Sequence, residues 1–387
     1  MRILCHAQHL SGVGHFVRMH ALACGLRAAG HEVHMIQGGR PVPHASDPWE
    51  PQAVHLPPLA RVAGTLVALD GAACVATVIE ERTRRLAAAV ERLRPDALLV
   101  DHYPFSKWEL DPELAAAVDA ARASNPAVRI LCSLRDIVRQ TRYEKAAPLA
   151  YEDRVLSLLR ARFDGILVHT DPAFTRLEEH FTRCAELPVA VEYTGFVTRT
   201  LPAADESAAG AYGVLSCGGG NAGLAFLRAA MEAFRRLATR GILGAMRLKV
   251  FASAAANDDE LATLAAAAEG GPFQIRPFGA EFERVLHDSA FSISRAGYNT
   301  CAALLRARTR AVLVPDPVMS DQAFRARRLA QLGLATVVEG DPPDVQALMA
   351  AVEATVARAR PRHELAVDGV ARTCRLVETV DEWTRMQ

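Results

Sequence analysis

The sequence alternates short apolar runs with longer amphipathic segments over most of its length, and this repeat constrains the fold more than any other feature. In the first half, apolar runs typical of buried strands start at Arg2, Glu32, Ala97, Arg129, Gly165 and Val189. Amphipathic helices are expected between some of them, for example over 72–93 and 113–123. This alternation is typical of parallel sheets that are covered by helices on both faces.

The alternation stops over 198–210, a small, polar stretch without apolar periodicity, and then starts again. Further strand-like runs begin at Tyr212, Arg247, Phe273, Phe291, Ala311 and Ala335. A chain of 387 residues is long enough for two separate cores. We therefore expect an α/β protein of two Rossmann-like domains, each a doubly wound parallel sheet, that face a central cleft. Ligands bind such sheets outside the carboxyl ends of the strands.

The expected domain boundaries lie at this break in the alternation of strands and helices. Residues 1–197 would form the first domain, 198–210 a linker and 211–362 the second domain. The last segment, 363–387, is expected to be a helix that can cross back to the first domain.

The charge balance and the cysteines argue against several classes of protein. Lys and Arg together number 44, as do Asp and Glu, so nucleic acid is not an expected partner. The eight cysteines show no C-x-x-C pair and no spacing typical of a zinc site. The N-terminus lacks the apolar core of a signal peptide, and no apolar run approaches the ~18 residues of a membrane span. We expect a cytoplasmic protein, with docking onto a membrane surface left open.

Two glycine-rich loops each lie between a strand-like run and a helix-like segment. The first, "SGVGHFVR", contains Gly12 and Gly14, whereas Val17 stands where a dinucleotide fingerprint has its third glycine. The second, "SCGGGNAG", contains all three fingerprint glycines, but neither following strand ends in the acid that would bind a ribose. NAD is therefore the weaker interpretation, although backbone N–H groups at a helix N-terminus still suit an anion. A tight βα turn without a ligand is the alternative.

His15 and Asp101 are the candidate catalytic bases. His15 stands where the first glycine loop becomes a helix, on the rim of the expected cleft. An imidazole with a pKa near neutrality can remove a proton from an attacking hydroxyl group. Asp101 ends a strand-like run and is the second candidate. The alternatives are a solvent-exposed or capping histidine and an ordinary turn residue at a strand end.

Further polar groups lie at two helix starts in the second half. Arg295, Ala296 and Gly297 form a strand-to-helix turn, after which Asn299 and Thr300 can reach ribose or phosphate oxygens. A helix cap is the alternative role of the threonine.

Asp321 and Gln322 open the next helix and offer acceptors and donors for adjacent sugar hydroxyls. The aspartate could equally be an ordinary first-turn residue. Together, three helix N-termini with polar groups favour a site for a nucleotide-diphosphate sugar.

These segments resemble those of a known family. The chain is similar over nearly its whole length to GT-B glycosyltransferases of the MurG type, which add GlcNAc in peptidoglycan synthesis. It resembles more closely a group of bacterial predicted glycosyltransferases. The resemblance is carried by the opening segment with Gly12, Gly14, His15 and Arg18, by "VDHYPFSKWEL" and "CSLRDIV", and by "SCGGGNAG", "RAGYNT" and Asp321-Gln322.

The resemblance implies a role for each motif. The second glycine loop would hold the donor diphosphate, Phe278-Gly279 would lie against the base, and the "GYNT" turn would lie near the ribose and α-phosphate. Asp321 and Gln322 would face the donor sugar, and His15 would act as a base or position the acceptor. The expected substrate-binding residues are Gly12, Gly14, Gly218, Gly219, Gly220, Asn221, Ala222, Phe278, Gly279, Arg295, Ala296, Gly297, Tyr298, Asn299, Thr300, Asp321 and Gln322.

The implied reaction is a metal-independent, inverting transfer of a hexosyl or N-acetylhexosaminyl group from a nucleotide sugar, with a UDP-sugar as the expected donor. No resident cofactor is expected, and the acceptor can be a small molecule, a peptide or a lipid-linked compound. Two positions depart from the family: Ala303 replaces a glutamate that would hold ribose hydroxyls, and Asp316 stands where relatives often have an arginine. A nucleotide-sugar hydrolase or epimerase, or a non-catalytic nucleotide-sugar-binding subunit, remains the alternative.

Overall fold

The computed structural model describes residues 1–10, 12–40, 42, 51–62, 64–69, 71, 74–138, 147–199, 212–219, 223–253, 256–279 and 281–384. The chain divides into two compact units. The first contains Met1–Val42, Ser46–Val197 and Asp368–Gln387, and the second contains Pro43–Ala45 and Thr198–Val367. Of the expected linker, only Thr198 and Arg199 belong to the described residues.

The first unit is built on a seven-stranded parallel sheet of order β3-β2-β1-β6-β7-β8-β9. Its strands are β1 (Arg2–Ala7), β2 (Glu32–Gln37), β3 (Gln52–His55), β6 (Ala97–Asp101), β7 (Arg129–Arg135), β8 (Gly165–His169) and β9 (Ala190–Tyr193). Strands β4 (Leu59–Val62) and β5 (Thr65–Ala68) form a separate antiparallel hairpin. Neither β3 nor this hairpin was anticipated from the sequence.

Helices cover both faces of the first sheet because its central strands are nearly continuous apolar runs that are buried on both faces. The helices are α1 (Gly14–Ala28), α2 (Val75–Leu93), α3 (Asp111–Ser124), α5 (Pro148–Arg162), α12 (Gly369–Glu378) and α13 (Val380–Thr384), with the short 3-10 helices η1 (Trp108–Leu110), η2 (Leu177–Glu179) and η3 (Cys184–Glu186). Helices α2, α3 and α5 share one apolar core with the sheet, and α1, α12 and α13 share the other.

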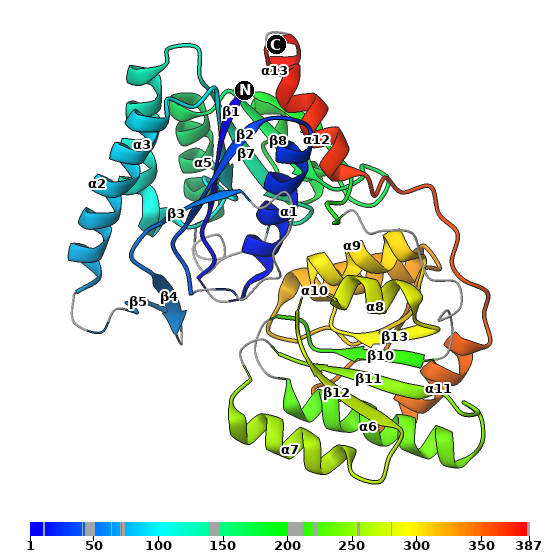
Figure 1. Ribbon diagram of the computed structural model, residues 1–387. Coiled ribbons are helices and arrows are strands. Elements are labelled where there is room, and N and C mark those ends of the chain that lie inside the picture. Colours follow the sequence, from blue (N-terminus) through cyan, green and yellow to red (C-terminus); the bar gives the residue numbers. More distant parts are fainter. Residues whose placement is uncertain are drawn as a thin grey trace. The chain divides into compact units, whose positions relative to one another are not determined.

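The C-terminal segment completes the first unit. Helix α12 packs against α1, as the red and blue helices of Figure 1 show. Gly165 of β8 leaves room for Trp383, since a Cβ there would lie 2.4 Å from the indole ring. The helical part of this segment starts at Gly369, whereas we expected a helix over 363–387.

The second unit is built on a six-stranded parallel sheet of order β12-β11-β10-β13-β14-β15. Its strands are β10 (Tyr212–Ser216), β11 (Arg247–Ala252), β12 (Phe273–Pro277), β13 (Phe291–Ser294), β14 (Arg310–Leu313) and β15 (Thr336–Val337). Its helices are α6 (Leu224–Thr239), α7 (Asp258–Ala268), α8 (Phe282–Asp288), α9 (Tyr298–Ala307), α10 (Ser320–Gln331) and α11 (Val345–Val356). Figure 1 shows α8, α9 and α10 on one side of this sheet and α6 and α7 on the other.

Both sheets confirm the expected α/β architecture and reverse their strand order once. The reversal lies between β1 and β6 in the first unit and between β10 and β13 in the second. In open parallel sheets, ligands bind at the carboxyl ends of the strands that flank such a reversal. Across the described residues, none of the helices is both long and apolar enough to cross a membrane.

Candidate active site

In the first unit, His15 and Asp101 meet at the point where the strand order reverses. His15 lies in the first turn of α1, just after the loop that follows β1, and Asp101 is the last residue of the neighbouring β6. His15 Nδ1 lies 2.9 Å from Asp101 Oδ2. Helix α1 is preceded by Val13 and has no side-chain cap, so His15 is not its capping residue. Gly12 lies in the loop and Gly14 begins the helix.

Asp101 is buried and surrounded by positive charge. Arg18 Nη2 donates to Asp101 Oδ1 at 2.5 Å, and the ammonium group of Lys107 forms an ion pair with Oδ2. Burial alone would raise the pKa of Asp101, but the interaction with His15 and the charges of Lys107 and Arg18 outweigh it and hold that pKa well below its usual range. The carboxylate is therefore ionised and can only accept hydrogen bonds.

His15 is neutral in this environment, although its side chain is 20% exposed. Burial and the charge of Arg135 lower its pKa well below the ordinary value, against the opposing effect of Asp101. Because the ionised Asp101 can only accept, Nδ1 carries the proton and Nε2 carries the lone pair. This is the protonation state that a general base needs. Asp101 itself is bonded to two cationic side chains, Arg18 and Lys107, and to the neutral His15, so it is suited to orienting His15 rather than to the expected role of second base.

Three neighbouring residues of this site received no role from the sequence. Arg18 was named only as part of a family signature, His102 was expected only to face the cleft beside Asp101, and Lys107 was not singled out. His102 follows Asp101 with a left-handed φ of +65°, and its backbone N–H donates to Ser133 O at 3.0 Å. Its ring lies 5.4 Å from the ring of His15. No spacing rule marks these residues, because a helix, a strand end and a loop bring them together.

In the second unit, the glycine loop follows β10 beside the reversal. Gly218 has a φ of +80° and donates its N–H to Ser216 Oγ at 3.0 Å. A Cβ at Gly218 would meet nothing within 4 Å, so the backbone angle and not crowding favours glycine there. Gly219 follows it, and Gly223 precedes α6 with a φ of +54°. The remaining expected diphosphate ligands, Gly220, Asn221 and Ala222, lie outside the described residues.

Arg295 follows β13, and its guanidinium group contacts protein rather than open space. Nη2 donates to Asp341 Oδ1 at 2.7 Å, and Nη1 lies 3.3 Å from both Val314 O and Pro315 O. The group also stacks over the ring of Phe226 at 4.4 Å. Arg295 therefore ties together the loops at the carboxyl end of the sheet, and its expected substrate contact stays a prediction.

Gln322 connects two of these loops. Its Oε1 accepts the backbone N–H groups of Ala296 and Asp316, each at 3.1 Å. From the same helix, Arg325 Nη1 donates to Ala296 O at 2.6 Å, and Nη2 lies 3.4 Å from Asp321 Oδ2. Helix α10 thus holds the turn that precedes α9, and the expected contact of Asp321 with a donor sugar stays a prediction.

The other expected donor-site residues lie around the same edge. Gly297 precedes α9, Asn299 is half-buried, and Tyr298 and Thr300 are buried in its first turn. Phe278 and Gly279 follow the outer strand β12, where the Phe278 ring lies 4.9 Å from that of Phe282.

The two departures from the family pattern are visible in the second unit. Ala303 is buried in α9 and offers no carboxylate for ribose hydroxyls. Asp316 accepts the N–H of Val318 through Oδ1 at 2.9 Å, so its side chain closes a turn in its own loop. Within the described residues, no three His, Cys, Asp or Glu side chains form a group suited to a metal ion.

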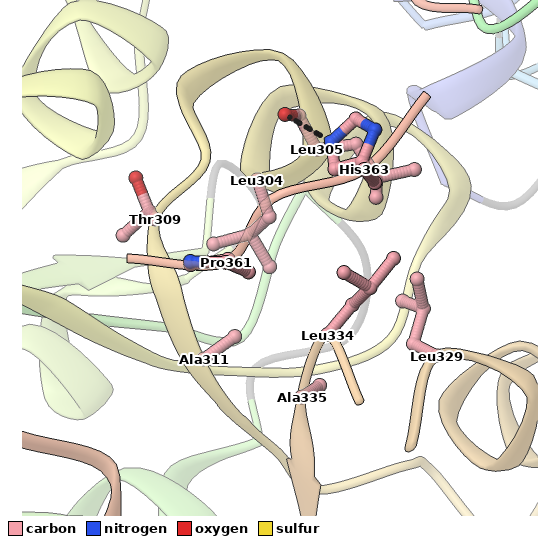
Figure 2. A pocket seen from close by; sticks show the side chains of 9 residues that line it. All are labelled: Leu304, Leu305, Thr309, Ala311, Leu329, Leu334, Ala335, Pro361 and His363. Carbon is pink, nitrogen blue, oxygen red and sulfur yellow. Dashed lines mark hydrogen bonds between the residues drawn. The ribbon is translucent and has the colours of Figure 1, made fainter. Parts of the chain in front are cut away.

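A small apolar pocket of the second unit lies away from this edge (Figure 2). It is lined by Leu304, Leu305, Thr309, Ala311, Leu329, Leu334, Ala335, Pro361 and His363. His363 Nε2 donates to Leu305 O at 2.9 Å, in the last turns of α9. The pocket therefore sits at the end of α9 opposite to the predicted donor-binding turn.

Solved structures of the same fold cover nearly the whole chain. The glycotransferase of kitacinnamycin matches with a TM-score of 0.58 and 15% identity, over 99% of this chain and 96% of that one. The calicheamicin glycosyltransferase CalG4 matches with 0.57 and 16%, over 98% and 94%. MurG of Acinetobacter baumannii matches with 0.57 and 15%, over 98% and 100%. The chain therefore has the GT-B glycosyltransferase fold.

A family model identifies the second unit more closely. Residues 214–364 match the glycosyltransferase family 28 C-terminal domain. No sequence among the curated proteins matches the chain. Residues 214–364 of the second unit are thus similar to the family 28 C-terminal domain, which supports the resemblance to MurG-type glycosyltransferases seen in its loops.

Proposed function

We propose that the chain transfers a sugar from a nucleotide-diphosphate donor, with a UDP-sugar as the expected one, to an acceptor hydroxyl group. The observation that carries the proposal is the buried Asp101 behind a neutral, partly exposed His15. The family of the second unit supports the donor half, because its members are glycosyltransferases. The acceptor is a small molecule, a peptide or a lipid-linked compound.

His15 Nε2 takes the proton of the acceptor hydroxyl while its oxygen forms a bond to the anomeric carbon of the sugar. The bond from that carbon to the diphosphate breaks, and the leaving group departs with the electron pair from the opposite face, which inverts the configuration. Asp101 stabilises the imidazolium that forms and keeps Nε2 turned outward. In the second unit, the N-termini of α6 and α9 offer positive dipole ends to the departing diphosphate.

The donor is tested first by thermal shift with UDP, dTDP, GDP, UDP-GlcNAc and UDP-glucose, with NAD as a comparison. A ligand that binds only the folded chain raises its melting temperature as its concentration passes Kd. We expect one nucleoside diphosphate and its sugar to shift the transition. If none of these compounds does, the donor site is weakened or lost at Ala303 and the donor proposal fails.

The base is tested with His15→Gln, and His55→Gln is the matched control because His55 is exposed in β3. With the donor identified, we expect His15→Gln to lower kcat by about 10²- to 10⁴-fold, and His55→Gln to leave it unchanged. A His15→Gln enzyme at full rate would remove His15 from the mechanism. Rapid free-sugar release without acceptor would instead indicate a hydrolase, and an interconverted nucleotide sugar an epimerase.

A further inference from the structure

The carboxylate behind His15 contacts more positive charge than a histidine–aspartate pair needs. Arg18 is fully buried and bonds to both Asp101 Oδ1 and Ser133 O, at 2.5 and 3.0 Å. Lys107 reaches the same carboxylate from the segment that follows β6, and its side chain is only 8% exposed. Its Nζ also lies 3.3 Å from Asp101 O. Two cationic side chains from different segments therefore share this carboxylate with His15.

The charges around His15 make its protonation costly. Asp101 is opposed by Arg18 and Lys107, so the cluster has one excess positive charge when His15 is neutral and two when it is protonated. Arg135, at the end of β7, adds a further positive charge that acts on His15. Such charges repel a proton strongly in a buried site, where the effective dielectric constant is low.

The two neighbouring histidines do not cancel this excess, and Asp136 offsets at most the charge of Arg135. His102, at the end of β6, has a pKa well below its usual value because of burial. The pKa of His9, in the loop after β1, is likewise lowered by burial. Both rings are therefore uncharged at neutral pH. Asp136 follows Arg135 and is buried, with Oδ1 accepting the N–H of Ile137 at 2.9 Å.

The backbone of Lys107 supplies an independent observation. Its φ is +64°, in the left-handed region that a lysine rarely adopts. Such conformations are unfavourable, and they persist where the surroundings hold them, often at functional sites. Here the strained residue is the one that directs an ammonium group onto Asp101.

We propose that Lys107 is a positioning residue that holds the Asp101 carboxylate and, through its charge, keeps His15 unprotonated on the acidic side of neutrality. The inference rests on the proposed function, because it assigns His15 as the base. An aspartate alone would make the imidazole easier to protonate. The two cations that share the carboxylate have the opposite effect and make the imidazole harder to protonate. The base is then weaker but stays available over a wider pH range.

Three variants separate charge from hydrogen bonding and packing. Lys107→Arg keeps the charge, Lys107→Gln keeps a donor without charge, and Lys107→Met keeps neither. The His15 imidazole is titrated by NMR in each folded variant, with its signal assigned by loss in His15→Gln. We expect the midpoint to rise in Lys107→Gln and Lys107→Met and to stay low in Lys107→Arg. Urea unfolding checks each fold, and the glutamine variant alone suffices if the methionine variant does not fold.

The same variants make a kinetic prediction. The acid limb of kcat/KM reports the protonation of the base in the free enzyme, so it should move to higher pH in Lys107→Gln and remain in place in Lys107→Arg. A His15 midpoint that is equal in wild type and Lys107→Gln would overturn the inference, whatever the activity. A shifted midpoint in a chain that turns over no nucleotide sugar would count against the proposed function alone.

Discussion

Gly25→Ala is expected to destabilise the first unit, although the same change stabilises most helices. Gly25 lies in the interior of α1, where alanine is normally better by about 1 kcal/mol. Here the new Cβ would lie 2.1 Å from Val370 Cγ1 of α12. Overpacking of this kind costs about 1–3 kcal/mol, so we expect a net loss of up to about 2 kcal/mol.

Val370→Ala should reverse the sign of this effect. Without Cγ1, the nearest atom of residue 370 is its Cβ at 3.6 Å, and Cys374 Sγ lies at 3.9 Å, both ordinary contacts. In that background Gly25→Ala should stabilise by about 0.5–1 kcal/mol. The difference between the two backgrounds is the coupling energy of a double-mutant cycle.

The assay is urea unfolding followed by tryptophan fluorescence. Residues 198–367 contain no tryptophan, so this signal follows the first unit. Four chains are compared: wild type, each single variant and the double variant. If Gly25→Ala stabilises wild type as much as it stabilises Val370→Ala, then α12 does not pack on α1 as described.

Three further predictions concern the edges of the two sheets and the thiols. Gln322→Leu leaves two loop N–H groups without their acceptor, at about 1–3 kcal/mol each, so the donor Kd measured by nucleotide titration should rise. Gln322→Glu keeps an acceptor and should bind the donor nearly normally. The lowered pKa of Asp101 contributes stability that is present above its unfolded pKa of ~3.9 and lost as pH falls through the folded value. The urea midpoint should therefore fall more steeply on acidification in wild type than in Asp101→Asn, and parallel curves would contradict this. Cys74 is exposed and its pKa is lowered by hydrogen bonds to Thr77, whereas Cys5 is buried and burial raises its pKa to about 12. Cys74 should therefore react with iodoacetamide before Cys5, and peptide mass spectrometry would show the order.

The architecture could be read from the sequence because each buried strand is a short apolar run between amphipathic helices. The meeting of His15 and Asp101 could not, since 86 residues separate them and the order of the strands decides which ends are neighbours. Lys107 lies in an irregular segment, where no periodicity predicts the direction of a side chain.

Gln322 shows a different limit of sequence reasoning. Its amide type fits sugar hydroxyls and loop N–H groups equally well, and only the fold brings Ala296 and Asp316 within reach of its oxygen. Arg295 shows the same limit, because its guanidinium group donates to the loop carbonyl oxygens of Val314 and Pro315. Residue type predicted where polar groups gather, whereas the partner of each group depended on the loops around it.

The return of the chain to its first unit has a consequence for biosynthesis. A ribosome makes the strands of the first sheet early, but α12 and α13, which cover one of its faces together with α1, are made last. Domains generally fold as units in the order of synthesis, yet here the second unit is complete before the first can be. Until Val377, Val380 and Trp383 emerge, the nascent sheet exposes an apolar face. The unit that begins the chain is thus the last to complete its folding.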